Sequence, residues 1–305
     1  MEFAQRAALP LEQKIKLSKQ RIKEWYAHHN GNVCISYSGG KDSDVLLHLV
    51  RSIYPDVLAI YMDTGVELPE IRAHVKSAEN VITVRPKLKF HQVIKKYGYP
   101  VASKDVATKV EQALNTSSAE LREKRMGEGI KGIPQKWRFL LDAPFKISAK
   151  CCYFLKHSGL NSYCKREGLL PYIGTRAQES TQRRSQYNKV GCNSYDAVRP
   201  LSMPMAFWSQ IDVWGYIVAH DIPYCEAYKM GYIRTGCMFC LFGIDRESNP
   251  NRFQLLHHHH PKLWNYALTT LGYKEVLDFL KVPYHFTGGI HKFNPGGFKH
   301  SPVIL

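Results

Sequence analysis

The sequence predicts an α/β protein built on a doubly wound, mostly parallel sheet. Apolar, strand-like runs alternate with helical segments between residues 31 and 97, and the turn Ser38-Gly39-Gly40-Lys41 joins the first strand to the first helix. Such alternation is typical of parallel sheets with helices on both faces. The 305 residues, 44% of them hydrophobic, are enough to bury a substantial core.

Each predicted element follows from its hydrophobic pattern. A short buried strand is predicted at 32–37, and the continuous apolar run at 57–62 predicts a fully buried parallel strand. Further strands are predicted at 81–84 and from Pro171 onwards. Apolar residues at helical spacing predict helices over 44–50, 67–78 and 90–97. A serine N-cap with an acidic residue three places later predicts another helix from Ser209.

Changes in composition divide the chain into three expected segments. Residues 1–30 form a helical N-terminal segment, 31–225 the α/β domain, and 226–305 a C-terminal extension with two cysteines and a glycine-rich, basic tail. Within the domain, about 100–148 is a basic helical insertion with Trp137 and Phe139 among its cations. This mixture suits a nucleic-acid groove. A solvated helical hairpin with two core aromatics explains it equally well.

A strand, two glycines and a helix N-terminus predict a phosphate-binding turn at 38–43. The glycines let the backbone approach an anion, and the unpaired N–H groups of the first helical turn point at it. Lys41 adds a positive charge. The common nucleoside-triphosphate loop is excluded, because Ile35 replaces its first glycine and Asp42 its Ser or Thr. A plain turn with a solvated lysine is the alternative.

The net charge of +16, from 42 Lys and Arg against 26 Asp and Glu, favours a polyanionic partner. A phosphate-binding site on a soluble basic surface would explain the same excess. No apolar run is long enough to cross a bilayer, and the first residues resemble neither a signal peptide nor a transit peptide. We therefore expect a cytoplasmic protein without a membrane partner.

Eight cysteines without a secretion signal favour metal or redox chemistry over disulfides. Cys151 and Cys152 are adjacent, and far downstream Cys237 and Cys240 form a C-x-x-C pair. Four thiolates can complete an iron–sulfur cluster or a structural zinc site, and the residues alone leave both open. Single buried or surface thiols are expected at Cys34, Cys164, Cys192 and Cys225.

The motif Ser-Gly-Gly-Lys-Asp-Ser at 38–43 resembles the pyrophosphate loop (PP-loop) of the ATP pyrophosphatase superfamily, whose members cleave ATP between the α and β phosphates. The four cysteines match the cluster-containing branch of the adenylylsulfate and phosphoadenylylsulfate reductases. Further matching segments are Asp63-Thr64-Gly65, Gly174-Thr175-Arg176, Glu179-Ser180 with Arg183, Arg199-Pro200-Leu201, 208–216 and 231–237. The resemblance spans roughly residues 30–245.

The resemblance implies an adenine nucleotide alpha hydrolase-like fold that binds ATP and Mg²⁺. It also implies a [4Fe–4S] cluster on Cys151, Cys152, Cys237 and Cys240, with structural Zn²⁺ as the alternative. The nucleotide-binding residues that it implies are Ser36, Ser38, Gly39, Gly40, Lys41, Asp42, Ser43, Asp63, Thr64, Gly65, Gly174, Arg176, Glu179 and Arg183. Among these it implies a catalytic role for Lys41, Asp42 and Ser43.

The resemblance to the reductases does not extend to their catalytic cysteine. Those reductases carry a catalytic cysteine in a C-terminal tail motif, whereas no cysteine follows Cys240 in this sequence. The pattern therefore lacks the nucleophile that sulfonucleotide reduction needs. The remaining features resemble the ATP pyrophosphatase component of DNA phosphorothioation systems and, more distantly, the tRNA thiolases of the same superfamily.

From this resemblance we expect an enzyme that adenylates an acceptor for sulfur incorporation. Nucleic acid is the expected acceptor, with DNA favoured over tRNA, and a cysteine desulfurase is the expected sulfur donor. Three alternatives stay open: a tRNA thiolation enzyme, a reductase that converts adenylylsulfate or phosphoadenylylsulfate to sulfite, and a nucleotide-sensing protein without turnover.

Overall fold

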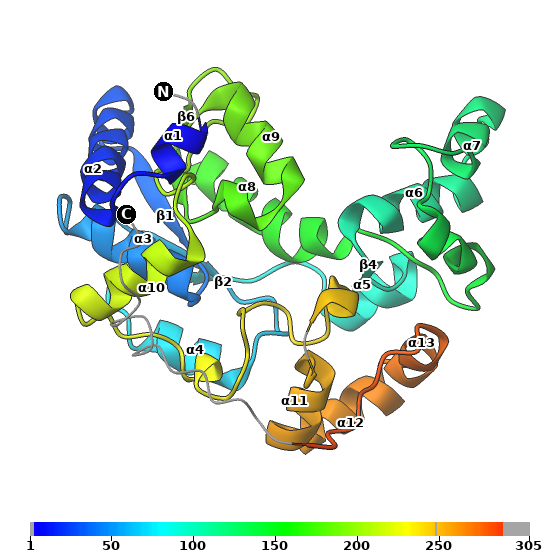
Figure 1. The fold of residues 1–305 in the computed structure, drawn as a ribbon. Coiled ribbons are helices and arrows are strands. Elements are labelled where there is room, and N and C mark those ends of the chain that lie inside the picture. The colour runs from blue at the N-terminus through cyan, green and yellow to red at the C-terminus, as the bar shows by residue number, and fades with distance from the viewer. Residues whose placement is uncertain (1–2, 248, 289–305) are drawn as a thin grey trace.

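The structure is a computed structural model that describes residues 3–247 and 249–288. Its centre is a six-stranded sheet in the order β3-β2-β1-β5-β7-β6, parallel throughout except between β6 and β7. The strands are β1 (Val33–Tyr37), β2 (Ala59–Met62), β3 (Val81–Val84), β5 (Leu170–Ile173), β6 (Asn193–Ser194) and β7 (Leu201–Ser202). The predicted α/β fold with a mostly parallel sheet is confirmed (Figure 1).

The expected helices are present with slightly different bounds. Those of the first half are α1 (Phe3–Ala7), α2 (Leu11–His28), α3 (Lys41–Arg51), α4 (Pro69–Lys76) and α5 (Phe90–Tyr97). Those after the insertion are α8 (Ser158–Glu167), α9 (Thr181–Val190) and α10 (Gln210–Ala219). The serine expected to cap α10 does so, because Ser209 Oγ accepts a hydrogen bond from the Asp212 N–H at 3.1 Å.

Helices cover both faces of the sheet. Helix α3 packs on β1 and β5 and is itself contacted by α2 and α10, while α8 packs on β2 and β3. Strand residues alternate between the faces, so Ile35 belongs to the main core whereas Cys34 joins a separate cluster with Cys164 of α8. The expectation of single thiols is wrong for this pair, because their Sγ atoms lie 3.7 Å apart.

The basic insertion consists of β4 (Val101–Ala102), α6 (Lys104–Asn115), α7 (Ala119–Met126) and a 3₁₀ segment, η1 (Gln135–Asp142). Helices α6 and α7 project together from the body of the molecule (Figure 1). The rings of Trp137 and Phe139 lie 6.0 Å apart, and Phe139 also contacts Phe279 at 5.6 Å. These aromatics therefore join the insertion to helix α13 (Tyr273–Phe279), although Phe139 is 41% exposed and is not a core residue.

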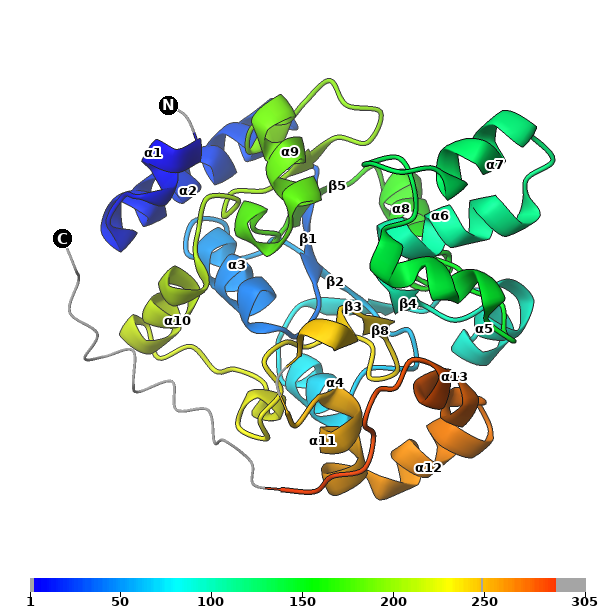
Figure 2. The same ribbon diagram turned by 45° about the vertical axis from the view of Figure 1, so that its right-hand side comes forward.

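The C-terminal part contains β8 (Leu241–Phe242), α11 (Arg252–His259), α12 (Pro261–Thr269) and α13 (Tyr273–Phe279). Strand β8 pairs in parallel with β4, and Figure 2 shows this pair beside α5, α12 and α13. The C-x-x-C segment is thereby tied to the start of the insertion. The expected basic tail beyond residue 288 lies outside the described residues. No helix in the described ranges has the length and apolar character that a bilayer crossing requires.

Candidate active site

The turn between β1 and α3 closes around Ser43. Its Oγ accepts hydrogen bonds from the N–H groups of Ser38 and Gly40, both at 3.2 Å, and donates one to the Gly40 carbonyl at 2.7 Å. Gly39 has a φ of +68°, and a Cβ at this position would lie 2.7 Å from Val75 of α4. Only glycine fits there without strain. The predicted strand–glycine–helix geometry is therefore present.

A chain of charges links this turn to the end of β5. Lys41 Nζ lies 3.0 Å from Asp42 Oδ2, and the other carboxylate oxygen of Asp42 pairs with Arg176 Nε. A Cβ on Gly174 would lie 2.9 Å from the Asp42 carbonyl oxygen, so the two turns are in close contact. Strands β1 and β5 flank the point where the strand order reverses, which is where open α/β sheets bind ligands. One carboxylate shared by two cations leaves a positive charge that suits phosphate.

Tyr228 and Thr235, which sequence reasoning missed, cover the phosphate loop. Tyr228 belongs to the 3₁₀ segment η4 (Glu226–Tyr228), and its hydroxyl accepts a hydrogen bond from the Lys41 N–H at 3.0 Å. Thr235 Oγ1 lies 3.3 Å from that hydroxyl, and a Cβ on Gly40 would lie 2.2 Å from Thr235 Oγ1. No local pattern marks these contacts, because they join residues far apart in the chain.

A buried carboxylate, Asp44, lies behind the loop. Its Oδ1 accepts a hydrogen bond from Tyr37 Oη at 2.8 Å and lies 2.9 Å from His74 Nε2. Burial raises the pKa of Asp44, and the bonds to His74 and Tyr37 oppose this only in part. Burial by itself lowers the pKa of His74, but the hydrogen bond to Asp44 and the carboxylate charge outweigh it and raise the pKa.

This pair predicts a pH dependence of stability. The folded state binds the His74 proton more tightly than the unfolded chain, whose ordinary pKa is 6.5. The stabilisation is therefore complete below that value and lost as pH rises through the raised pKa. The raised pKa of Asp44 acts in the same direction at lower pH. We expect the free energy of unfolding, measured by urea titration, to fall as the pH rises above 6.5.

The variant His74→Gln should flatten this fall, whereas His258→Gln, which changes an exposed histidine, should leave it unchanged. Equal pH slopes in wild type and His74→Gln would show that the pair does not control stability.

The turn after β2 pairs with the C-x-x-C segment, which comes from a distant part of the chain. Thr64 donates hydrogen bonds to Glu67 from its N–H (3.1 Å) and Oγ1 (2.6 Å). Glu67 forms an antiparallel bridge with Cys237, and the Met238 N–H donates to the Val66 carbonyl at 2.8 Å. Residues 66 and 67 are thus held in extended conformation, which explains why α4 begins at Pro69 and not at 67.

The four cysteines expected to bind metal line one small enclosed cavity together with Lys156. In the part of the chain that the structure describes, no three His, Cys, Asp or Glu side chains converge closely enough to hold a metal ion. The donors nevertheless suit one. A hydrogen bond from Cys151, followed by the charges of Lys104 and Lys156, lowers the pKa of Cys152 to about 6, and the thiolate is the form that binds metal. Four thiols around one cavity fit a zinc site or an iron–sulfur cluster.

Lys156 is a third residue that sequence reasoning missed. The Cys237 thiolate, and more weakly Glu67, raise its pKa, so it stays charged beside the thiols. Its position four residues after Cys152 places both on one helical face, a spacing that could have identified it.

A cleft of about 290 Å³ adjoins the cysteines and is strongly basic. The cations that line it are Lys104, Lys156, Arg183, Arg234 and Arg252. Arg183, which the sequence predicted, pairs with Glu179, and the Glu179 carboxylate accepts the Arg176 N–H at 3.1 Å. Thr235 also lines this cleft. Because Thr235 touches the phosphate loop as well, the loop and the cysteines share one wall.

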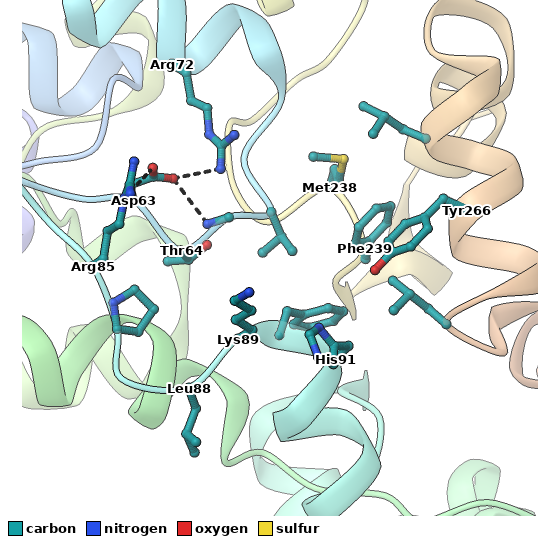
Figure 3. A pocket seen from close by; sticks show the side chains of 16 residues that line it. Asp63, Thr64, Arg72, Arg85, Leu88, Lys89, His91, Met238, Phe239 and Tyr266 are labelled. Carbon is teal, nitrogen blue, oxygen red and sulfur yellow. Dashed lines mark hydrogen bonds and ion pairs between the residues drawn. The ribbon is translucent and has the colours of Figure 1, made fainter.

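Two groups of predicted nucleotide contacts lie elsewhere: one is Asp63, Thr64 and Gly65, which line a single pocket, and the other is Ser36. Asp63 lines a different pocket, where its carboxylate is engaged by Arg72 Nη2 at 2.8 Å, Arg85 Nε at 3.5 Å and the Gly65 N–H at 3.2 Å (Figure 3). Ser36 lies within β1, opposite Ile60 and Ile173 of the neighbouring strands. The nucleotide roles of both remain predictions.

Comparisons with known proteins assign the family. The chain is 27% identical over 284 residues to an uncharacterized protein of Methanocaldococcus jannaschii, covering 87% of this chain but only 55% of the relative. It is 24% identical over 245 residues to an adenosine 5'-phosphosulfate reductase of Staphylococcus epidermidis (80% of this chain, 84% of the relative). It is 28% identical over 226 residues to a phosphoadenosine 5'-phosphosulfate reductase of Xylella fastidiosa (72% and 77%). The family model of the phosphoadenosine phosphosulfate reductase domain matches residues 32–241, and the chain therefore belongs to that family.

Proposed function

We propose that this protein is an ATP pyrophosphatase that adenylates an acceptor for sulfur incorporation. The observation that carries the proposal is the path of residues 228–237. Tyr228 and Thr235 touch the phosphate loop, and Cys237, two residues further on, lines the four-cysteine cavity. An acceptor activated at the loop would therefore lie beside the thiols and the cleft that Lys156 and Arg183 make basic.

In the proposed first step, an oxygen of the acceptor attacks the α-phosphate of ATP. A bond forms between that oxygen and the α-phosphorus, the bond to the bridging oxygen breaks, and pyrophosphate leaves. The loop glycines, Lys41 and the α3 N-terminus hold the leaving group, and Arg176 adds a second cation. Asp42 is the carboxylate at the loop that would bind Mg²⁺, which would neutralise phosphate charge, and it would give up its pair with Lys41 or Arg176 to do so.

In the second step, sulfur at the oxidation level of sulfide replaces the activated oxygen, and AMP leaves with that oxygen. A cysteine desulfurase is the proposed source of the sulfur; it delivers the sulfur as a persulfide, and a thiol reductant supplies the two electrons that bring it to the level of sulfide, leaving a disulfide. Cys151, Cys152, Cys237 and Cys240 would hold the metal centre, proposed as a [4Fe–4S] cluster with Zn²⁺ as the alternative. A cluster would supply electron transfer or bind sulfur. Lys156 holds a positive charge beside these four cysteines.

Nucleic acid is the proposed acceptor, and DNA is favoured over tRNA. The net charge of +16 supports a polyanion, since each neutralised phosphate releases counterions. The insertion adds exposed cations, among them Arg122, Lys124 and Lys131. We place this activity in the cytoplasm, where ATP and a desulfurase are available.

Product analysis with ATP labelled in the α-phosphate tests this reaction. Cleavage between the α and β phosphates yields pyrophosphate and an AMP adduct, or free AMP once the adduct reacts. Formation of ADP and inorganic phosphate would contradict the proposal.

Sulfonucleotide reduction is the second candidate, because two of the relatives described above are named as reductases of this type. In the printed sequence the last cysteine is Cys240, so this reaction would need one of the thiols already described as nucleophile. Sulfite formation from adenylylsulfate or phosphoadenylylsulfate is the measurement that would favour it.

A further inference from the structure

A second pocket, of about 420 Å³, lies beyond Asp63 on the β3 side of the sheet. It opens between the start of α5 and helix α12, which come from distant parts of the chain (Figure 3). The mechanism proposed above does not use it. Its lining combines one aromatic and aliphatic wall with one cationic wall.

The apolar wall offers a ring face of the kind on which a nucleobase stacks. Tyr266 of α12 is 40% exposed and lies 6.4 Å from Phe239, centroid to centroid. Leu263 and Leu271 extend this wall. A partly exposed tyrosine backed by buried apolar residues offers a flat face to a ligand, and base–aromatic stacking is tolerant of sequence.

The opposite wall is cationic. Arg72 and Arg85 share the single carboxylate of Asp63, so this group of three keeps a net positive charge. The Arg85 side chain is 79% exposed and contacts Asp63 only at 3.5 Å, which leaves most of its donors available. Lys89 lies on the same rim and is exposed. Arginine and lysine beside an aromatic face suit the phosphate and base of one nucleotide.

The pocket adjoins the proposed reaction site, with one buried residue between them. Met238 lines both this pocket and the basic cleft, and it lies between Cys237 and Cys240 in the chain. A polymer strand that occupies the cleft could thus place a neighbouring unit here.

We infer that this pocket binds one nucleotide of the acceptor strand, with its base on Tyr266 and its phosphate at Arg85 and Lys89. The inference rests on the proposed function, because it takes the acceptor to be nucleic acid. It adds a subsite that holds the strand while a neighbouring position reacts.

Fluorescence anisotropy with a labelled single-stranded DNA of about ten nucleotides tests the subsite. We expect Tyr266→Ala to weaken binding about ten-fold, because one stacking contact is lost. The matched control is Tyr163→Ala, which removes a partly exposed tyrosine from α8, outside the pocket, and should bind like wild type. Wild-type affinity in Tyr266→Ala would overturn the inference.

A second pair of variants tests the cationic wall within one loop. Lys89→Gln removes a charge that lines the pocket, and Lys87→Gln removes an equally exposed charge two residues away that is not part of the lining. We expect the slope of log affinity against log salt to fall by about one for Lys89→Gln and by clearly less for Lys87→Gln. Equal slopes in the two variants would contradict a phosphate contact at Lys89.

Kinetics with ATP distinguishes failure of this inference from failure of the proposed function. If Tyr266→Ala raises the KM for ATP and not the Kd for DNA, the pocket holds the adenine of ATP and the inference is wrong, while the ATP reaction stands. If wild type releases pyrophosphate but binds no strand, both the acceptor assignment and the inference fail. If wild type binds DNA but releases no pyrophosphate, the proposed reaction fails. DNA binding by Tyr266→Ala and Lys89→Gln then decides whether the subsite exists.

Discussion

Replacing Lys41 with alanine is expected to lower the rate of pyrophosphate release from ATP by about 10²–10³-fold. Lys41 is the cation of the phosphate loop, and Asp42 fixes its ammonium group at 3.0 Å. A positive charge held in advance at the leaving group stabilises the transition state without reorganisation cost. Steady-state release of pyrophosphate, measured in a coupled assay at saturating ATP, provides the rate.

Lys14→Ala is the matched control for this variant. Lys14 is also a buried lysine with a single carboxylate partner: its Nζ lies 2.7 Å from Asp212, and its side chain, like that of Lys41, is 4% exposed. Lys14→Ala leaves Asp212 without this cation, whereas Asp42 keeps Arg176 in Lys41→Ala, so we expect a loss of stability of about 1–3 kcal/mol in Lys14→Ala and no larger loss in Lys41→Ala. Only the Lys41 variant should lose turnover. Wild-type rates in Lys41→Ala, or equal losses in both, would show that the loop is not the catalytic site.

Replacing Cys237 and Cys240 together with serine is expected to remove essentially all bound iron from protein purified without oxygen. Serine keeps the size of the side chain but is a poor ligand for iron, and only Cys151 and Cys152 would remain in the cavity. Iron content per chain and the visible absorption of the cluster report the loss independently of activity.

Buried cysteines outside the cavity provide the control. Cys192 and Cys225 are buried free thiols, like Cys151, but neither lines the four-cysteine cavity. Cys192→Ser with Cys225→Ser should keep its iron. Zinc in the wild type and none in the variant that replaces both Cys237 and Cys240 would establish the structural-zinc alternative. Unchanged metal in both would refute the assignment of these ligands.

The fold was largely predictable because its information is local. The continuous apolar run at β2 and the apolar face of α3 come from neighbouring residues, and the glycine turn fixes how β1 meets α3. The pairing of β4 with β8 was not predictable. These strands have two residues each and lie far apart in the chain, so neither shows a periodic pattern.

The candidate site was predictable in its motifs but not in its assembly. The sequence pointed to Lys41, Asp42 and Arg176, and the structure brings them together in one chain of ion pairs. Nothing in the sequence indicated that Tyr228 and Thr235 would cover the loop, because a single hydroxyl residue forms no recognisable spacing pattern. Asp63 was predicted to contact the nucleotide together with the phosphate loop. In the structure, Arg72 and Arg85 pair with the Asp63 carboxylate in the neighbouring pocket.

The most direct test of the central claim compares two reactions of the same anaerobic preparation. One assay measures pyrophosphate release from ATP, alone and with DNA or tRNA, and the other measures sulfite formation from adenylylsulfate or phosphoadenylylsulfate with a thiol reductant. We predict release of pyrophosphate that DNA stimulates more than tRNA, and no sulfite. Sulfite formation without pyrophosphate release would contradict the proposal and identify a sulfonucleotide reductase.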